Sequence, residues 1–182
     1  LYDVQSKQFT SALNQFDAAV NSESKGKYSE YYKAFYYLNR GVLRAEMIDF
    51  ISSIENNVQT LTMDDKGTTR ARVRDQVSRS YDYSEAIEDM QAADRILPGI
   101  PYVYFNLGNL YCLSSKFVES VDSYTKAINV YPYMGDAYYN RGLVLIYLKD
   151  KEKGCIDLSR AGELGVGDAY SVISKYCEEE KK

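Results

Sequence analysis

The chain has 182 residues, of which 45% are hydrophobic and 26% are charged, a composition typical of a folded globular protein and not of a disordered one. Its formal net charge of −4 argues against general nucleic-acid binding, which requires a broad basic surface. Because histidine is absent, Cys–His and Ser–His nucleophile pairs are excluded and zinc would need Cys, Asp or Glu alone, so we expect no enzyme, no metal and no cofactor.

The first segment, 1–27, is predicted to contain a single helix and a polar loop. Residues Gln5–Val20 have the spacing of small and aromatic residues that marks the second helix of each later repeat, but no first helix precedes them. The stretch Asn21–Lys27 is rich in Ser, Lys and Gly, which favours a loop. Since the chain begins with Leu1 and not with Met, we expect a fragment that starts within a repeat.

An internal repeat predicts four helical hairpins, at 28–66, 67–100, 101–134 and 135–167. Gly142 follows Gly108 by one period of about 34 residues, and Gly41 precedes Gly108 by close to two such periods. Small residues of the second helices recur with the same period at Ser53, Ala86, Ser120 and Gly154, and again two helical turns later at Thr60, Ala93, Ala127 and Ala161.

Within each repeat, apolar residues follow the i, i+3, i+4, i+7 spacing of an amphipathic helix. A glycine on the first helix and a small residue on the second would let the two axes approach closely. Pro98 and Pro132 each follow a second helix and are expected to end it. Because one hairpin cannot bury its apolar face alone, the hairpins should stack, which predicts an all-α fold with a concave and a convex wall.

The second repeat and the C-terminus depart from this pattern. In the unit 67–100, Arg70 and Arg74 stand where the other units have an aromatic residue and a glycine. Its first helix, expected at Thr68–Ser80, should therefore be short or loosely docked. The last segment, 168–182, is predicted to be a capping helix with a polar end that can face water.

One repeat carries a recognisable set of residues: Tyr104, Leu107, Gly108, Tyr111, Ser120, Tyr124, Ala127 and Pro132. This pattern resembles the tetratricopeptide repeat (TPR), and the tail after Lys151 resembles the C-terminal ends of bacterial TPR proteins. The resemblance implies an α-α superhelix, a solenoid of antiparallel hairpins, that binds a protein or peptide on its concave wall. It does not identify the partner.

The family's geometry, applied to this sequence, implies a groove with aromatic anchors and asparagine contacts. The residues that it places there are Phe35, Leu38, Val42, Tyr102, Phe105, Asn106, Asn109, Cys112, Tyr139, Asn140, Leu143, Ile146 and Tyr147. Two alternatives stay open: the aromatic side chains could instead pack between helices, and an asparagine such as Asn39 could bond its own helix. The family's basic clamp for chaperone tails is missing, so that class of partner is not expected.

Arg72 and Arg79 share a helical face with Asp75 by their spacing. They could bind an anion or an acidic peptide, and we include them among the groove candidates. The alternative, which we favour, is a solvated face with internal ion pairs.

Cys155 and Cys177 lie on the last repeat and on the cap, so stacked neighbours could bring them together. Two buried free thiols are the default expectation, and a disulfide that staples the cap is the alternative. A disulfide would imply an oxidising compartment. No apolar run approaches the ~20 residues that span a bilayer, so we expect a soluble chain, while the choice between cytoplasm and periplasm stays open.

The expected function is recognition of a protein or peptide in the concave groove. A first alternative is a structural spacer from a longer solenoid, which predicts no peptide binding and self-association through Gln5–Val20. A second alternative, an enzyme or small-molecule binder, would require a deep pocket with convergent polar groups.

Overall fold

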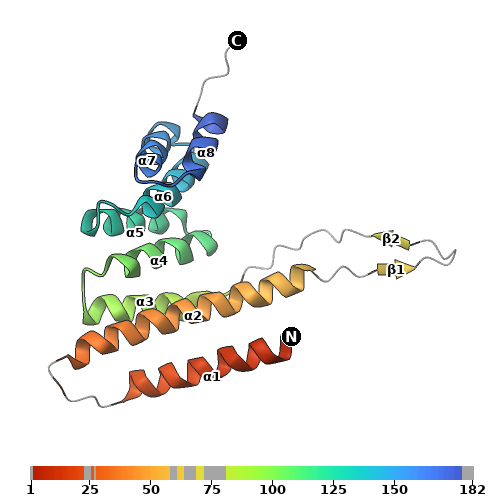
Figure 1. Ribbon diagram of the computed structural model, residues 1–182, viewed down its shortest axis with the longest axis vertical. Helices are drawn as coiled ribbons and strands as arrows, with labels where there is room; N and C mark the ends of the chain where they lie inside the picture. Colours follow the sequence, from red (N-terminus) through yellow and green to blue (C-terminus); the bar gives the residue numbers. More distant parts are fainter. Residues whose placement is uncertain are drawn as a thin grey trace, which may run out of the picture.

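The computed structural model describes residues 2–22, 26, 28–57, 61–63, 69–71 and 81–177 (Figure 1). This part of the chain is all-α apart from a short antiparallel hairpin, β1 (Leu61–Met63) and β2 (Thr69–Ala71), in which Leu61 pairs with Ala71. The helices are α1 (Tyr2–Asn21), α2 (Ser29–Asn57), α3 (Ser84–Ile96), α4 (Pro101–Leu113), α5 (Phe117–Val130), α6 (Gly135–Tyr147), α7 (Lys151–Glu163) and α8 (Asp168–Tyr176).

The predicted hairpin over 28–66 is wrong, because α2 is one continuous helix of 29 residues. After Gly41 the sequence runs through Leu, Arg, Ala, Glu and Met with no proline or further glycine up to Asn57, so nothing ends the helix. The later pairs differ at this point. Their first helices end at turns in which Ser115 and Lys149 adopt positive φ angles of 58° and 67°.

The first helix expected at Thr68–Ser80 is also wrong where it can be checked, since Thr69–Ala71 forms strand β2. The rest of that expected helix lies outside the described residues. Helix α3 packs against α2 instead. A Cβ added at Gly41 would lie 3.0 Å from the carbonyl oxygen of Ala86, so α2 supplies the partner helix for α3.

The chain between α2 and α3 is therefore an insertion within one helix pair. In the two later pairs, a single tight turn separates the glycine of the first helix from the small residue of the second, Gly108 from Ser120 and Gly142 from Gly154. In the first pair, the equivalent stretch from Gly41 to Ala86 is far longer. The added length contains the end of α2 and the β1–β2 hairpin, which extends to one side of the helices (Figure 1).

The close approach expected at the glycines is present in the later pairs. At the α4–α5 crossing, the Ser120 hydroxyl donates a 2.8 Å hydrogen bond to the carbonyl oxygen of Gly108. A Cβ at Gly108 would lie 2.5 Å from the Tyr124 ring, and a Cβ at Gly142 would lie 2.9 Å from the carbonyl oxygen of Gly154. Any side chain at these glycines would push the paired helices apart.

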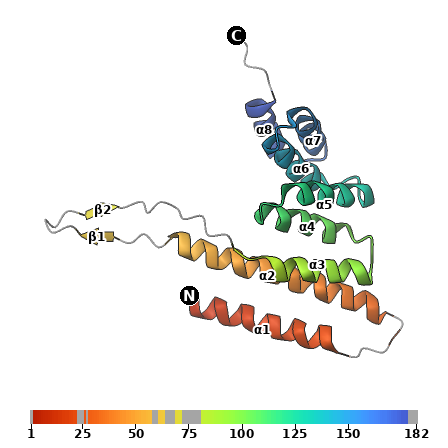
Figure 2. The same cartoon turned by 180° about the vertical axis from the view of Figure 1, so that it is seen from behind.

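The helix pairs α2–α3, α4–α5 and α6–α7 lie in successive layers, and each contacts the next through α3–α4 and α5–α6 (Figures 1 and 2). Two apolar clusters fill the layers. One joins α2, α3 and α4 around Met90 and Val103, both fully buried. The other joins α4, α5 and α6 around Tyr124, Ala127 and Ala137.

Two of the pairs share an ion pair in the same register. Arg40 precedes Gly41 and donates to both carboxylate oxygens of Asp89, and its pKa is raised chiefly by the hydrogen bond to that carboxylate. Arg141 precedes Gly142 and donates in the same way to Asp157, at 2.7 and 2.8 Å. Each bidentate pair ties the first helix of a pair to the second next to the glycine contact.

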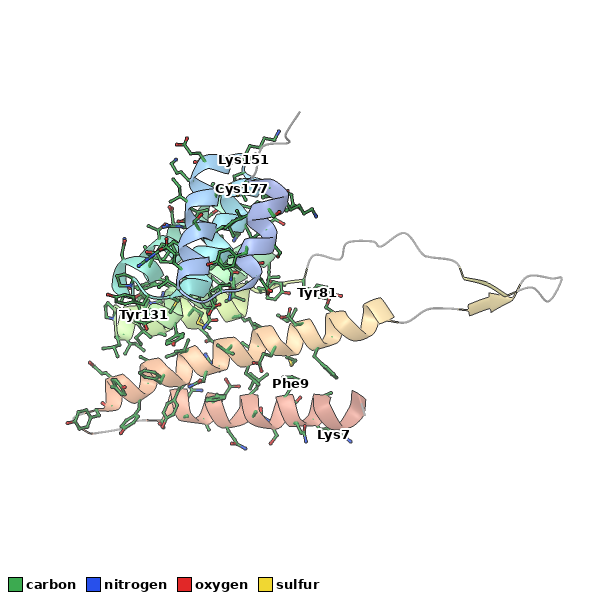
Figure 3. The ribbon with its side chains drawn as sticks, turned by 45° about the horizontal axis from the view of Figure 1, so that its top comes forward. Lys7, Phe9, Tyr81, Tyr131, Lys151 and Cys177 are labelled. Atoms are coloured by element: carbon green, nitrogen blue, oxygen red, sulfur yellow. A yellow bond between two sulfur atoms is a disulfide. The ribbon has the colours of Figure 1, made fainter. Side chains whose placement is uncertain are left out.

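Helices α1 and α8 cover the two ends of the layered helices. Phe9 of α1, labelled in Figure 3, contacts Phe50 of α2 with ring centroids 5.7 Å apart. At the other end, α8 packs on α7, and a disulfide joins Cys155 of α7 to Cys177 directly after α8 (Figure 3). Of the two alternatives for these cysteines, the structure has the disulfide.

Replacing Ala127 by leucine should destabilise the protein by about 1–3 kcal/mol, because Ala127 is fully buried where α5 meets its neighbours and a larger side chain overpacks the contact. Urea unfolding followed by circular dichroism measures the change. Asn129→Leu adds the same side chain at an exposed position of the same helix and should change stability by less than about 0.5 kcal/mol. Equal unfolding midpoints for the two variants would contradict the helix packing described above.

Candidate partner-binding groove

A groove with a volume of about 520 Å³ opens along the first helices of the three pairs, α2, α4 and α6. Side chains from all three helices line it, joined by one residue each from α3 and α5. The lining residues are Val42, Ala45, Glu46, Asp49, Met90, Asn106, Asn109, Leu110, Cys112, Leu113, Tyr124, Asn140, Leu143 and Val144. The groove therefore crosses three layers of the fold.

The groove has an apolar floor with apolar side chains that project from it. Leu110 and Val144 are buried and belong to the packed interior. Leu113 of α4 and Leu143 of α6 also line the groove, yet they are 52% and 37% exposed. Exposed leucines in a concave surface offer apolar area that a bound segment could cover.

A hydrogen-bond network of asparagines and a tyrosine crosses the groove between α4, α5 and α6. The Oδ1 atom of Asn109 accepts a 2.6 Å bond from the Tyr124 hydroxyl and a 3.0 Å bond from the Nδ2 atom of Asn140. Burial raises the pKa of Tyr124, so its phenol stays a donor across the physiological range. Asn106 makes no side-chain hydrogen bond to any described residue, which leaves its amide available.

The α2 wall of the groove carries two carboxylates, Glu46 and Asp49, both exposed. The Tyr83 hydroxyl donates a 3.0 Å hydrogen bond to Oδ1 of Asp49. Burial, and then this bond, raise the pKa of Tyr83 to about 12, so the tyrosine remains a neutral donor that holds the aspartate in place. Cys112 of α4 is half-buried in the groove, and burial raises the pKa of its thiol.

The structure brings six of the residues expected from the sequence together in this groove: Val42, Asn106, Asn109, Cys112, Asn140 and Leu143. They come from three helices that lie in separate layers. Arg72 and Arg79 lie outside the described residues.

Several other expected groove residues lie elsewhere, because their side chains face neighbouring helices. Leu38 is 8% exposed in the core between α2 and α3, and Phe35 packs against the same core. Phe105 packs on the Tyr124 ring at 6.0 Å, and Tyr147 packs on Phe117 at 4.6 Å.

Four further candidates do not line the groove: Tyr102, Tyr139, Ile146 and Asn39. Tyr102 is 59% exposed at the start of α4, and Tyr139 is half-buried on α6; neither contributes to the lining. Asn39 donates from Nδ2 to the carbonyl oxygen of Phe35 at 2.8 Å, so it bonds its own helix.

Sequence reasoning missed the carboxylate wall of the groove. Ala45 and Glu46 hold the register positions of Cys112 and Leu113, which also line the groove. Asp49 lines it because α2 continues past the point where a hairpin turn was expected. A signal was available: no breaking residue follows Gly41 until Asn57, which predicts a longer helix.

A second hollow of about 790 Å³ lies where α1, α2 and the end of α3 meet. Its lining mixes the cations Lys33 and Arg95 with Glu30 and several polar groups. Every residue that lines the groove along α2, α4 and α6 belongs to the described part of the chain.

No family model matches the chain, and no curated protein is similar to it. Among the described helices, none combines the length and apolarity needed to cross a lipid bilayer. Across the same described residues, no three Cys, Asp or Glu side chains gather as a metal-binding group would require. Any function must therefore be argued from the geometry and chemistry of the groove.

Proposed function

We propose that the chain is a TPR-like right-handed superhelix that recognises a segment of another protein in the groove along α2, α4 and α6. The observation that carries the proposal is the groove itself, which three helices from three layers line together. The spacing of Gly108 and Gly142 by one repeat period and the small residues that face them support the repeat assignment.

The groove offers the kinds of contact that a bound peptide uses. Leu113 and Leu143 provide exposed apolar anchors on two adjacent layers. The free amide of Asn106 can donate to and accept from a peptide backbone, while the Asn109–Asn140 bond fixes the surrounding groups. A preformed surface of this type costs little ordering when a partner binds.

The same groove favours binding over catalysis. Cys112 is the one thiol that lines it, and burial raises the pKa of that thiol, whereas a nucleophilic cysteine needs a lowered pKa. The lining also lacks any described lysine or arginine that could stabilise a developing negative charge.

The proposal can be tested by selecting peptides from a phage-displayed library of random dodecapeptides on the immobilised full chain. Affinity of the selected peptides is then measured by fluorescence anisotropy. Leu113→Ala combined with Leu143→Ala should weaken binding about tenfold or more, because it removes both exposed anchors. Melting curves check that the variant stays folded, since Leu113 and Leu143 are 52% and 37% exposed and neither belongs to the buried core.

A matched control removes two exposed apolar side chains outside the groove. Val118 and Ile156 are 65% and 62% exposed, and the variant Val118→Ala with Ile156→Ala should bind as the wild type does. The proposal would be contradicted if both double variants lost affinity equally, or if the selected peptides bound the Leu113/Leu143 variant as tightly as the wild type. A selection that yields no binding peptide would favour the alternative of a structural spacer.

A further inference from the structure

We infer that the segment bound in the groove is basic: it presents a lysine or arginine to Glu46 and Asp49 and apolar side chains to Leu113 and Leu143. This inference rests on the proposed function and adds the chemical class of the partner to it. It follows from how charge is distributed on and around α2.

The charged side chains that line the groove are both acidic. Glu46 and Asp49 are three residues apart on α2, so they lie on one face of the helix. Both are exposed, and among the described residues neither has an ion-pair partner. Two neighbouring carboxylates repel each other, and a cation placed between them relieves that repulsion.

The arginines closest to these carboxylates in the sequence are engaged elsewhere. Arg40 donates to Asp89 and Asp17, and Arg44 donates to Asp89 at 2.6 Å. Arg44 also reaches the exposed Glu85 at 3.3 Å. The side chains of Arg40 and Arg44 are only 12% and 20% exposed, so they stay on the α3 side of α2.

A third arginine near the groove also forms its hydrogen bonds between helices of the fold. Arg141 of α6 donates to both oxygens of Asp157 and to the Thr125 hydroxyl. These three arginines therefore join neighbouring helices, and within the described ranges they leave the carboxylates of the groove without an ion-pair partner. A cation from a partner would complete the set of ion pairs.

Asp49 is held ready for such a cation. Its Oδ1 atom accepts the hydrogen bond from Tyr83, which is 5% exposed and therefore fixed in place. A carboxylate has lone pairs for several donors, so Oδ2 can accept from a lysine ammonium or an arginine guanidinium. Because the carboxylate is already oriented, little side-chain entropy is lost on binding.

The positions of the groove walls also predict the order of cationic and apolar residues along the bound segment. The carboxylates come from α2, and the exposed leucines come from α4 and α6, the next two layers. A segment that crosses the layers would therefore meet the carboxylates at one end and the leucines towards the other. The expected ligand is a cation followed or preceded by two apolar residues, and a phosphate-bearing ligand is disfavoured.

The test uses the peptides selected on the full chain, which should be enriched in lysine or arginine together with leucine-like side chains. Glu46→Gln combined with Asp49→Asn should weaken their binding roughly fivefold or more. Raising the NaCl concentration from about 0.05 M to about 0.5 M should weaken wild-type binding and have less effect on this variant, because salt screens exposed charges. Melting curves check that the variant stays folded; asparagine can still accept the bond from Tyr83.

Glu88→Gln combined with Asp122→Asn is the matched control, because it removes two exposed carboxylates outside the groove. It should leave the affinity unchanged. If selected peptides depend on Leu113 and Leu143 but carry no cation, or bind equally well to the Glu46/Asp49 variant, the inference is overturned and the proposed function stands. If the leucine variant binds normally, the proposed function itself fails.

Discussion

Replacing Asp89 by asparagine should lower the free energy of unfolding by about 3 kcal/mol or more, the cost of leaving buried charges without their partner. Asp89 lies on α3 with its side chain 3% exposed, between Arg40 and Arg44 of α2. Asparagine has nearly the same shape and no charge. The variant therefore removes the anion while keeping the volume of the side chain.

The geometry explains the size of the expected effect. Arg40 donates from Nε to Oδ2 of Asp89 at 2.9 Å and from Nη2 to Oδ1, and Arg44 adds a bond to Oδ2 at 2.6 Å. An asparagine would offer one acceptor oxygen and would point its amide hydrogens at a guanidinium. Asp17 of α1 contacts Arg40 at 2.6 Å but is 47% exposed, so it would compensate only part of the loss.

Urea denaturation followed by circular dichroism gives the measurement, and Glu88→Gln provides the control on the same helix. Glu88 is exposed, so its neutralisation should change stability by less than about 0.5 kcal/mol. An Asp89→Asn variant within about 1 kcal/mol of wild type would mean that the two arginines find water or other acceptors, and that α2 and α3 are held mainly by apolar contacts.

The Arg–Asp ion pairs have a signal in the sequence that the spacing of glycines and small residues does not include. The triplet Asn-Arg-Gly occurs at residues 39–41 and 140–142, and an aspartate follows three residues after the small residue of each partner helix. The middle pair has Leu107 and Ser123 at the same two positions, both buried and both uncharged, so no ion pair can form there. The arginine and the aspartate are either both present in a helix pair or both absent from it. This joint occurrence is a sequence signal that the two positions are in contact.

The later half of the fold could be predicted because each turn has a local cause. The range 101–134 contains α4 and α5, and 135–167 contains α6 and α7, in agreement with the spacing of glycines and small residues. Pro101 begins α4 at its first position, where a missing backbone N–H costs nothing. Tight turns that include Ser115 and Lys149 then bring the second helices back.

The first half of the fold could not be predicted because the insertion between α2 and α3 is almost as long as one repeat. The stretch from Gly41 to Ala86 is longer than the equivalent stretch of the later pairs by almost one repeat period. The glycine and small-residue markers therefore stay in phase across the insertion, although no hairpin of the expected kind lies between them in the described part of the chain. Ser53 belongs to α2 itself, so its match to the marker pattern does not identify a second helix.

The same error explains which groove residues were found. Val42, Asn109 and Leu143 follow from the helix register alone, which the repeat markers fix. Glu46 holds the register position of Leu113, whereas Asp49 enters the groove only because α2 continues, which depends on the absence of a stop signal. The aromatic side chains were assigned to the groove by analogy, whereas burial drives rings such as Phe105 into the contact with α5.

Breaking the disulfide with Cys155→Ser and Cys177→Ser together should destabilise the folded chain by about 3 kcal/mol, the chain-entropy value for a loop of this length. The two cysteines are 22 residues apart, and the bond ties the end of α8 to α7. Inside α8 the one buried residue is Ala169, so apolar packing alone holds this helix weakly. Its docking should therefore depend on the covalent link more than on contacts.

Thermal unfolding with and without dithiothreitol distinguishes this role from a general effect of mutation. Reduced wild type should unfold at the same temperature as the double serine variant, and dithiothreitol should not shift that variant further. Cys112→Ser, which removes the free thiol of the groove, should keep the response to dithiothreitol. A wild-type melting temperature that does not change when dithiothreitol is added would contradict a stabilising role of the Cys155–Cys177 disulfide.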